Sequence, residues 1–220
     1  MPPYACAQVP AAQPEASNPR RWLWAVVTIV WFSAAAAGLW VLWAYENQPG
    51  ASAHALPQWP AGSGLTYDTQ RPTLVMLVHP QCVCSRASLA ELAEILARAR
   101  TRPKTYVLFL KPRGFADGWE KTDTWRAAAA LPDVTVVRDD EGATAEHFGA
   151  VTSGQTFLYD SSGGLAFTGG ITGSRGHAGD NAGRASVVAL LNRQPSVPAA
   201  ATSVFGCSLF DADPGRGSTR

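Results

Sequence analysis

The longest hydrophobic stretch of the chain runs from Trp22 to Ala44, 23 residues without a charged side chain. A helix of roughly 20 apolar residues crosses the hydrocarbon core of a bilayer. This stretch would be apolar on every side of a helix, and tryptophans stand near both of its ends, as in the aromatic belts of membrane-spanning helices. The pattern predicts a transmembrane anchor over residues 20–45, with residues 22–44 in contact with the lipid bilayer.

Charges on either side of this stretch indicate its orientation. Arg20 and Arg21 precede it and Glu46 follows it, and basic flanks stay on the cytoplasmic side of a membrane. We therefore expect a single-pass inner or cell membrane protein with a cytoplasmic N-terminus and a periplasmic or extracellular C-terminal part. A cleaved signal peptide is the alternative, because Ala51-Ser52-Ala53 resembles a cleavage site. The apolar core of a signal peptide is, however, usually only about 7 to 15 residues long.

Residues 73–194 alternate between strand-like and helix-like patterns. Continuous apolar runs indicate buried strands, and apolar residues repeated every three or four positions indicate helices. Strands are predicted at residues 73–78, 106–110, 134–137, 155–159 and 165–168, and helices at residues 86–100, 120–130, 143–148 and 184–192. The turn at residues 160–164 makes the last two strands a hairpin. This order predicts an α/β fold in which a mixed sheet is flanked by helices.

Three other segments contain few large aliphatic residues. Residues 1–19 predict a disordered cytoplasmic tail, and residues 46–72 predict a flexible tether. Residues 195–220 form a C-terminal tail rich in Pro, Ala and Gly, with one apolar island at residues 204–210 that surrounds Cys207. We expect this island to dock on the domain and to bring its thiol to a site there.

Composition narrows the range of functions. Lys and Arg number 18 against 17 Asp and Glu, so no basic excess predicts binding to nucleic acid. Four cysteines in 220 residues are too few for a disulfide-stapled scaffold. Cys6 precedes the predicted anchor and would lie across the membrane from the other three cysteines. The candidate chemistry therefore rests on Cys82, Cys84 and Cys207.

Two of these cysteines stand where a strand gives way to a helix. Cys82 and Cys84 follow the first long strand and a His79-Pro80 pair. The N–H groups at a helix N-terminus stabilise a thiolate and can lower a cysteine pKa well below its free value of roughly 8.5. Two cysteines one residue apart form only a strained, reducible disulfide, so they can instead share a metal or pair with Cys207. His79 suits either purpose, since it can stabilise a thiolate or ligate a metal.

The order of elements, with a thiol motif after the first long strand, resembles the thioredoxin superfamily over residues 73–194. The nearest likeness is to its membrane-anchored, extracytoplasmic members, such as the RedB-like branch. In that family a C-x-x-C motif begins the first helix, so the resemblance implies Cys82 as nucleophile and places Ser85 where the second cysteine would be. Cys84 has no counterpart in that register, and Gln155 stands where the family has a cis-proline facing the motif. This departure keeps a non-catalytic interaction module as an alternative.

The resemblance implies a thiol–disulfide oxidoreductase that needs no cofactor and acts on an extracytoplasmic protein partner. In this hypothesis Cys82 attacks a partner disulfide, and Cys84 or Cys207 releases the mixed disulfide. A copper chaperone is the alternative from another class. Its soft Cu(I) site would use Cys82 and Cys84 together with His79 or His177.

Overall fold

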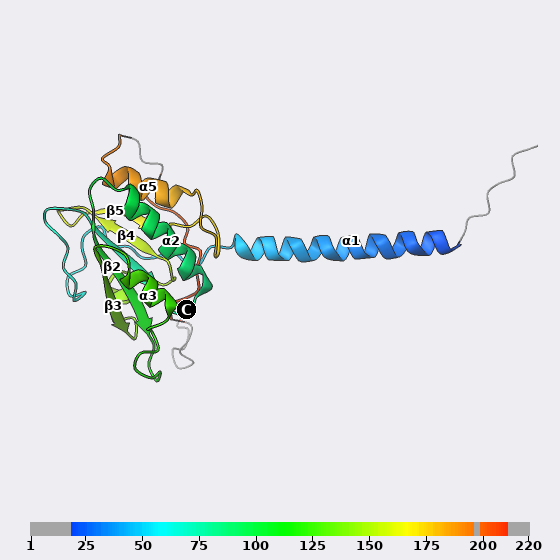
Figure 1. Cartoon of the computed structure of the whole chain (residues 1–220), viewed down its shortest axis with the longest axis horizontal. Coiled ribbons are helices and arrows are strands. Elements are labelled where there is room, and N and C mark those ends of the chain that lie inside the picture. The colour runs from blue at the N-terminus through cyan, green and yellow to red at the C-terminus, as the bar shows by residue number, and fades with distance from the viewer. Residues whose placement is uncertain (1–18, 196–198, 211–220) are drawn as a thin grey trace, which may run out of the picture. The chain divides into compact units, whose positions relative to one another are not determined.

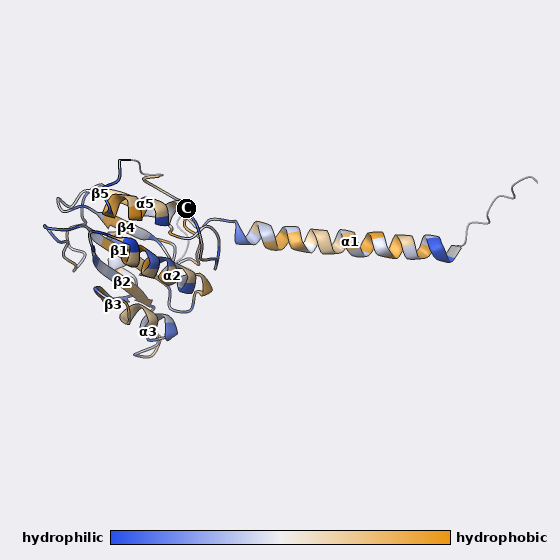
Figure 2. Ribbon diagram, turned by 45° about the horizontal axis from the view of Figure 1, so that its top comes forward, coloured by the Kyte–Doolittle hydropathy of each residue, from blue (hydrophilic) through white to orange (hydrophobic). Residues whose placement is uncertain are grey.

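The computed structural model describes residues 19–195 and 199–210, which form a long helix and a globular domain (Figure 1). The helix, α1 (Pro19–Glu46), coincides with the apolar stretch at the start of the chain. The helix contains an 18-residue window with a mean hydropathy of 2.1, so α1 is long and apolar enough to cross a membrane by length and composition. Figure 2 shows apolar residues along its length and polar residues at its ends.

The domain contains a five-stranded sheet in the order β3-β2-β1-β4-β5. Its strands are β1 (Thr73–Val78), β2 (Lys104–Lys111), β3 (Val134–Asp140), β4 (Thr156–Tyr159) and β5 (Leu165–Gly169). β2 runs parallel to both β1 and β3, whereas β4 pairs antiparallel with β1 and with β5. The helices are α2 (Val83–Arg98), α3 (Asp123–Ala129), α4 (Ala143–His147) and α5 (Ala182–Leu191). The predicted fold class, a mixed sheet flanked by helices, is confirmed.

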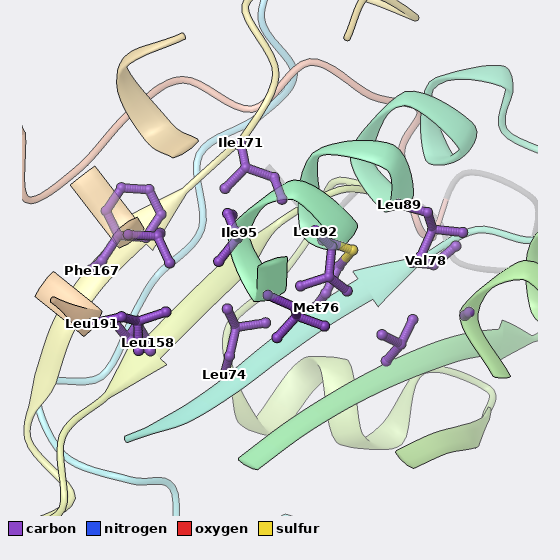
Figure 3. Packing of buried hydrophobic residues seen from close by; sticks show 14 of the residues in the cluster. Leu74, Met76, Val78, Leu89, Leu92, Ile95, Leu158, Phe167, Ile171 and Leu191 are labelled. Atoms are coloured by element: carbon purple, nitrogen blue, oxygen red, sulfur yellow. The ribbon is translucent and has the colours of Figure 1, made fainter. Parts of the chain in front are cut away.

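β1 carries the centre of both hydrophobic cores, and all six of its residues are buried. Successive side chains of a strand point to opposite faces of the sheet. Leu74, Met76 and Val78 therefore pack on one face, against apolar residues of α2 and α5 (Figure 3). Val75 and Leu77 pack in a second cluster on the other face. Burial on both faces explains why the strand is a continuous apolar run.

Part of the second face is covered by a segment for which the sequence predicts a flexible tether. In the structure, however, Trp59 packs against Phe148 and Tyr159, and the centroid of its ring lies 5.2 Å from that of Phe148 and 5.1 Å from that of Tyr159. The backbone is also bound, since His54 N–H donates to the carbonyl of Gly149 at 2.9 Å. The segment therefore belongs to the domain. Its small and polar composition gave no sign of this role, because few large side chains of the segment, such as Trp59 and Leu65, pack on the core.

The described part of the C-terminal tail also packs on the domain. Residues 199–202 run beside β5, where Thr168 N–H donates to the Ala200 carbonyl at 3.1 Å and Thr202 N–H donates to the Thr168 carbonyl at 3.2 Å. Farther along, Val204 and Leu209 are buried. The apolar island around Cys207 is thus docked on the domain.

Candidate thiol site

The cysteine motif lies at the N-terminus of α2, directly after β1. Cys82 is the N-cap residue of α2, and its N–H donates to the carbonyl of His79 at 3.1 Å in the turn that leaves β1. Cys82 and Cys84 are 4% and 3% exposed, whereas Val83 between them is 81% exposed. The two thiols therefore face the protein, and the intervening valine faces solvent.

Cys207 reaches this pair because the tail pairs with the loop that precedes β4. Ser153 N–H donates to the carbonyl of Cys207 at 2.8 Å, and Leu209 N–H donates to the carbonyl of Val151 at 2.9 Å. Thr152 and Ser208 form an antiparallel bridge between these two bonds. This short ladder places the thiol of Cys207 in hydrogen-bonding contact with Cys82.

The three thiols have different acidities. Burial opposes ionisation of Cys82, but hydrogen bonds from the thiols and backbone N–H groups of Cys207 and Cys84 outweigh it and lower its pKa. Burial and the negative charge of Cys82 raise the pKa of Cys84. Burial and the hydrogen bond to Cys82 raise the pKa of Cys207 to about 12. Cys82 is therefore the thiol that ionises first, and its two neighbours keep their protons and donate to it.

A loop at residues 174–179 adds positive polarity to the site. The N–H of Gly176 donates to the sulfur of Cys84, and the Arg175 guanidinium lowers the pKa of both Cys84 and Cys207 by its charge, although burial prevails at each. The same guanidinium donates to the carbonyl of Gly206 at 2.8 Å and to that of Gln48 at 3.1 Å. Arg175 thus ties the tail to the site.

This loop is held on α2 by a buried carboxylate. Glu91 is 1% exposed and accepts hydrogen bonds from the Gly179 N–H and from Arg184, the latter at 2.7 Å. Arg184 also pairs with the exposed carboxylate of Asp180. Because α2 carries the cysteines at its start and Glu91 two turns later, the same helix positions both the thiols and the loop that contacts them.

His79 is placed beside the motif but has other partners. Its Nδ1 accepts from the Gln81 N–H at 3.2 Å, and its ring meets Trp119 edge to face with centroids 5.7 Å apart. Burial lowers the pKa of His79, which favours the neutral imidazole near neutral pH. His79 therefore contributes no positive charge to the thiolate there, and its structural contacts fix the turn that leads into α2.

The other predicted supporting residues brace the same turn. Ser85, where the family has its second cysteine, donates to the His79 carbonyl at 2.9 Å and lies 3.1 Å from the hydroxyl of Ser153. The Pro80 carbonyl accepts from the hydroxyl of Thr124 at 3.2 Å. Ser85 and Pro80 therefore link the motif to the loop before β4 and to α3.

Gln155 and His177 do not join the thiols. The Gln155 side chain donates to the hydroxyl of Thr168 on β5 at 2.9 Å, and the backbone carbonyl of Gln155 accepts from the Leu77 N–H. The Nδ1 of exposed His177 lies 2.8 Å from the carbonyl of Arg175. The described residues also contain no group of three or more His, Cys, Asp or Glu side chains arranged to hold a metal ion. Copper binding stays a prediction.

Sequence reasoning missed Arg175, Gly176, Glu91 and Ser153. The loop that carries Arg175 is rich in glycine, which permits close approach to other groups but does not reveal its target. Glu91 is a charged residue, and charged residues of a helix are usually exposed. Its buried partner, Arg184, lies 93 positions later in the chain, so no local pattern could pair them.

The strand order, the antiparallel β4–β5 pair and the thiol motif after β1 give the domain a thioredoxin-like fold. The chain is similar in structure to an uncharacterized conserved protein from Geobacillus kaustophilus, with a TM-score of 0.50 and 17% identity over 74% of this chain and 92% of that one. It is also similar to a hypothetical protein from Sinorhizobium meliloti, with a TM-score of 0.49 and 18% identity over 74% of this chain and 94% of that one. The chain is similar as well to an exposed lipoprotein thioredoxin from Streptococcus pneumoniae, with a TM-score of 0.40 and 16% identity over 56% of this chain and 84% of that one.

No protein-family model and no curated protein sequence matches the chain. At these identities the structural likeness concerns the fold. The chemistry of the domain has to be argued from its own thiols.

The hydrogen bond from Cys207 to Cys82 leads to a prediction. Replacing Cys207 with alanine removes the thiol donor, so we expect the pKa of Cys82 to rise, whereas Cys207→Ser keeps a donor and should leave the pKa closer to that of the native protein. The pKa is measured as the midpoint of the rate of Cys82 alkylation against pH, with the modified residue assigned by mass spectrometry. Equal midpoints in the two variants would show that the Cys207 thiol does not stabilise the thiolate.

Proposed function

We propose that the protein is a membrane-anchored thiol–disulfide oxidoreductase whose thioredoxin-like domain acts on an extracytoplasmic protein partner. The observation that carries this proposal is the convergence of Cys84 and Cys207 on Cys82, whose pKa is lowered although the residue is buried. The thiolate is the nucleophile in disulfide exchange, so a thiol of lowered pKa beside two others provides both an attacking and a resolving group. The RedB-like branch of the thioredoxin superfamily stays our prediction for the kind of oxidoreductase that this protein resembles.

In the proposed reaction the reduced protein transfers two electrons to a partner disulfide. The Cys82 thiolate attacks one partner sulfur, a mixed disulfide forms, and the other partner sulfur leaves as a thiolate and takes up a proton. A second cysteine of the chain then loses its proton and attacks the Cys82 sulfur. This forms an internal disulfide and releases the second partner sulfur as a thiolate, which is protonated in turn. The reverse sequence would oxidise a partner dithiol.

Cys207 is the better candidate for the second cysteine. Its thiol donates to Cys82 directly, and its separate backbone segment can adjust to the geometry of a disulfide. Cys84 is only two positions from Cys82, and a disulfide across one intervening residue is strained. Cys84 then acts as a donor to the Cys82 thiolate, and Cys207 acts as the resolving thiol.

The location is proposed from the properties of α1. Its length and apolar composition suit a membrane span, and Arg20 and Arg21 favour a cytoplasmic N-terminus. The domain would then lie in an oxidising compartment, where a thiol pair can cycle between dithiol and disulfide states.

Mass mapping of the full chain in detergent tests the proposal. The protein is reduced with dithiothreitol, treated with a mild oxidant, alkylated and digested, and we expect a disulfide between Cys82 and Cys207 only after oxidation. The Cys84→Ser variant serves as the control and should form the same disulfide. If no pair among the three thiols changes state between the two treatments, the redox function is wrong. A disulfide between Cys82 and Cys84 would move the resolving role to Cys84.

A further inference from the structure

The C-terminal tail covers the thiol that a partner would have to reach. Cys82 is 4% exposed, whereas Cys207, which contacts it, belongs to the exposed residues. The tail segment 203–209 (within the red end of the described chain in Figure 1) reaches Cys82 through its pairing with residues 151–153. A piece of the same chain therefore contacts the buried nucleophile and presents a cysteine to it.

The pairing depends on the absence of a side chain before the cysteine. Gly206 is buried, and a Cβ atom at this position would overlap the carbonyl oxygen of Ser153. The tail also approaches the domain closely at a second glycine, Gly170, where an added Cβ atom would lie 2.5 Å from the carbonyl oxygen of Ser203. The backbone of the tail therefore lies directly on the backbone of the domain. Only a chain with glycine in front of its cysteine follows this path without displacing Ser153.

A charged side chain also holds the tail. The Arg175 guanidinium donates to the Gly206 carbonyl at 2.8 Å, so Gly206 contacts both this guanidinium and the backbone of Ser153. Apart from the contacts of the Cys207 thiol and N–H with Cys82, the tail is held here through its own carbonyls. Ser153 N–H donates to the Cys207 carbonyl, and Arg175 donates to the Gly206 carbonyl. Such contacts fit any extended polypeptide with a glycine before its cysteine.

We propose that tail residues 203–209 are a built-in occupant of the edge formed by residues 151–153, and that a partner reaches Cys82 only when its own extended Gly–Cys segment replaces them. This inference rests on the proposed function and names the partner class, an extended polypeptide with glycine before the reacting cysteine. The tail and the partner alternate on one edge. When the tail returns, it displaces the partner backbone and brings Cys207 back to the Cys82 sulfur.

The Gly206→Ala variant of the full chain in detergent tests whether the tail covers Cys82. We compare the limiting rate of Cys82 alkylation by iodoacetamide at high pH, where the thiolate is fully formed and only access differs. An added Cβ should displace the tail and raise this rate about tenfold or more, since local opening governs the reaction of buried groups. Gly173→Ala is the matched control, because its Cβ would meet only ordinary contacts at 3.7 Å or beyond. Equal rates in the native, Gly206→Ala and Gly173→Ala proteins would overturn the inference.

A second variant tests the same inference in case the Gly206→Ala protein misfolds. Arg175→Ala removes the guanidinium without inserting an atom between two backbones, and it should also raise the limiting rate, whereas Arg100→Ala at an exposed position should not. Thermal unfolding of each variant shows whether the domain is intact. If an intact Arg175→Ala protein is alkylated at the native rate, the tail is not the cover.

Peptides identify the partner class. In the Gly206→Ala protein, a synthetic peptide with the sequence of residues 203–209 and serine in place of Cys207 should bind the vacated edge and slow alkylation of Cys82. The same peptide with alanine in place of Gly206 should not. Equal protection by both peptides, or by neither, would overturn the requirement for glycine. These alkylation and peptide measurements need no redox reaction. They can therefore contradict the role of the tail while the disulfide mapping supports the redox function, or support the role of the tail while the mapping contradicts the redox function.

Discussion

Replacing Cys82 with serine is expected to abolish disulfide exchange by the reduced protein, with a loss of at least about a thousandfold in rate, as for removal of an enzyme nucleophile. A serine hydroxyl does not ionise near neutral pH and does not attack a disulfide. The remaining thiols are poor replacements, because burial, the largest cause of the raised pKa of both Cys84 and Cys207, persists in this variant. The rate is measured with the full chain in detergent and a disulfide-linked model peptide whose cleavage releases a fluorophore.

The Cys84→Ser protein is the matched control for this loss. Serine at this position keeps a hydrogen-bond donor near Cys82, and the thiol that it replaces is mostly protonated near neutral pH. We therefore expect a much smaller decrease than for Cys82→Ser. If the two variants lose activity equally, Cys84 shares the role of nucleophile and the assignment to Cys82 is wrong.

Replacing Glu91 with glutamine should lower the free energy of unfolding by about 3 kcal/mol, the usual effect of breaking a buried ion pair by removing one partner. The Arg184 side chain is only 8% exposed, and without Glu91 it keeps only the exposed carboxylate of Asp180 as an ionic partner. The loop at residues 174–179 would also lose its anchor on α2. Denaturant unfolding of the full chain in detergent, followed by tryptophan fluorescence, measures the change.

Glu94→Gln provides the comparison on the same helix. Glu94 pairs with Arg98 at 2.9 Å, but both side chains are about half exposed, at 51% and 54%. An exposed pair of this kind contributes roughly 0 to 1 kcal/mol. Equal losses in Glu91→Gln and Glu94→Gln would mean that burial of the Glu91–Arg184 pair does not matter for stability.

Much of the fold could be predicted because its signals are local. β1 is a continuous apolar run that the structure buries on both faces. The β4–β5 hairpin follows from the turn at residues 160–164, where the Gly163 N–H donates to the carbonyl of Asp160 at 3.0 Å. The cysteine motif was recognisable for the same reason, since strand, thiols and helix are contiguous in the chain.

The features that complete the site depend on distant residues. Cys82 is contacted by Cys207 and Cys84 by the Gly176 N–H, and no periodicity links these positions. The segment with Trp59 predicts a tether because it contains few large aliphatic residues, although Trp59 and Leu65 pack on the core of the domain. The charge of Glu91 likewise favours exposure, whereas its pairing with Arg184 permits its burial.

The contact between Cys82 and Cys207 also sets the order in which the site can form during synthesis. The two residues are 207 − 82 = 125 positions apart, so the nucleophile leaves the ribosome well before the thiol that covers it, and contacts of such long range form late. Until Cys207 emerges, Cys82 has only Cys84 as a thiol donor and lacks the contact with the tail, so it is open to foreign thiols. Correct maturation of the domain therefore depends on synthesis through Cys207, and a chain that stops short of this residue would be released with an unprotected nucleophile.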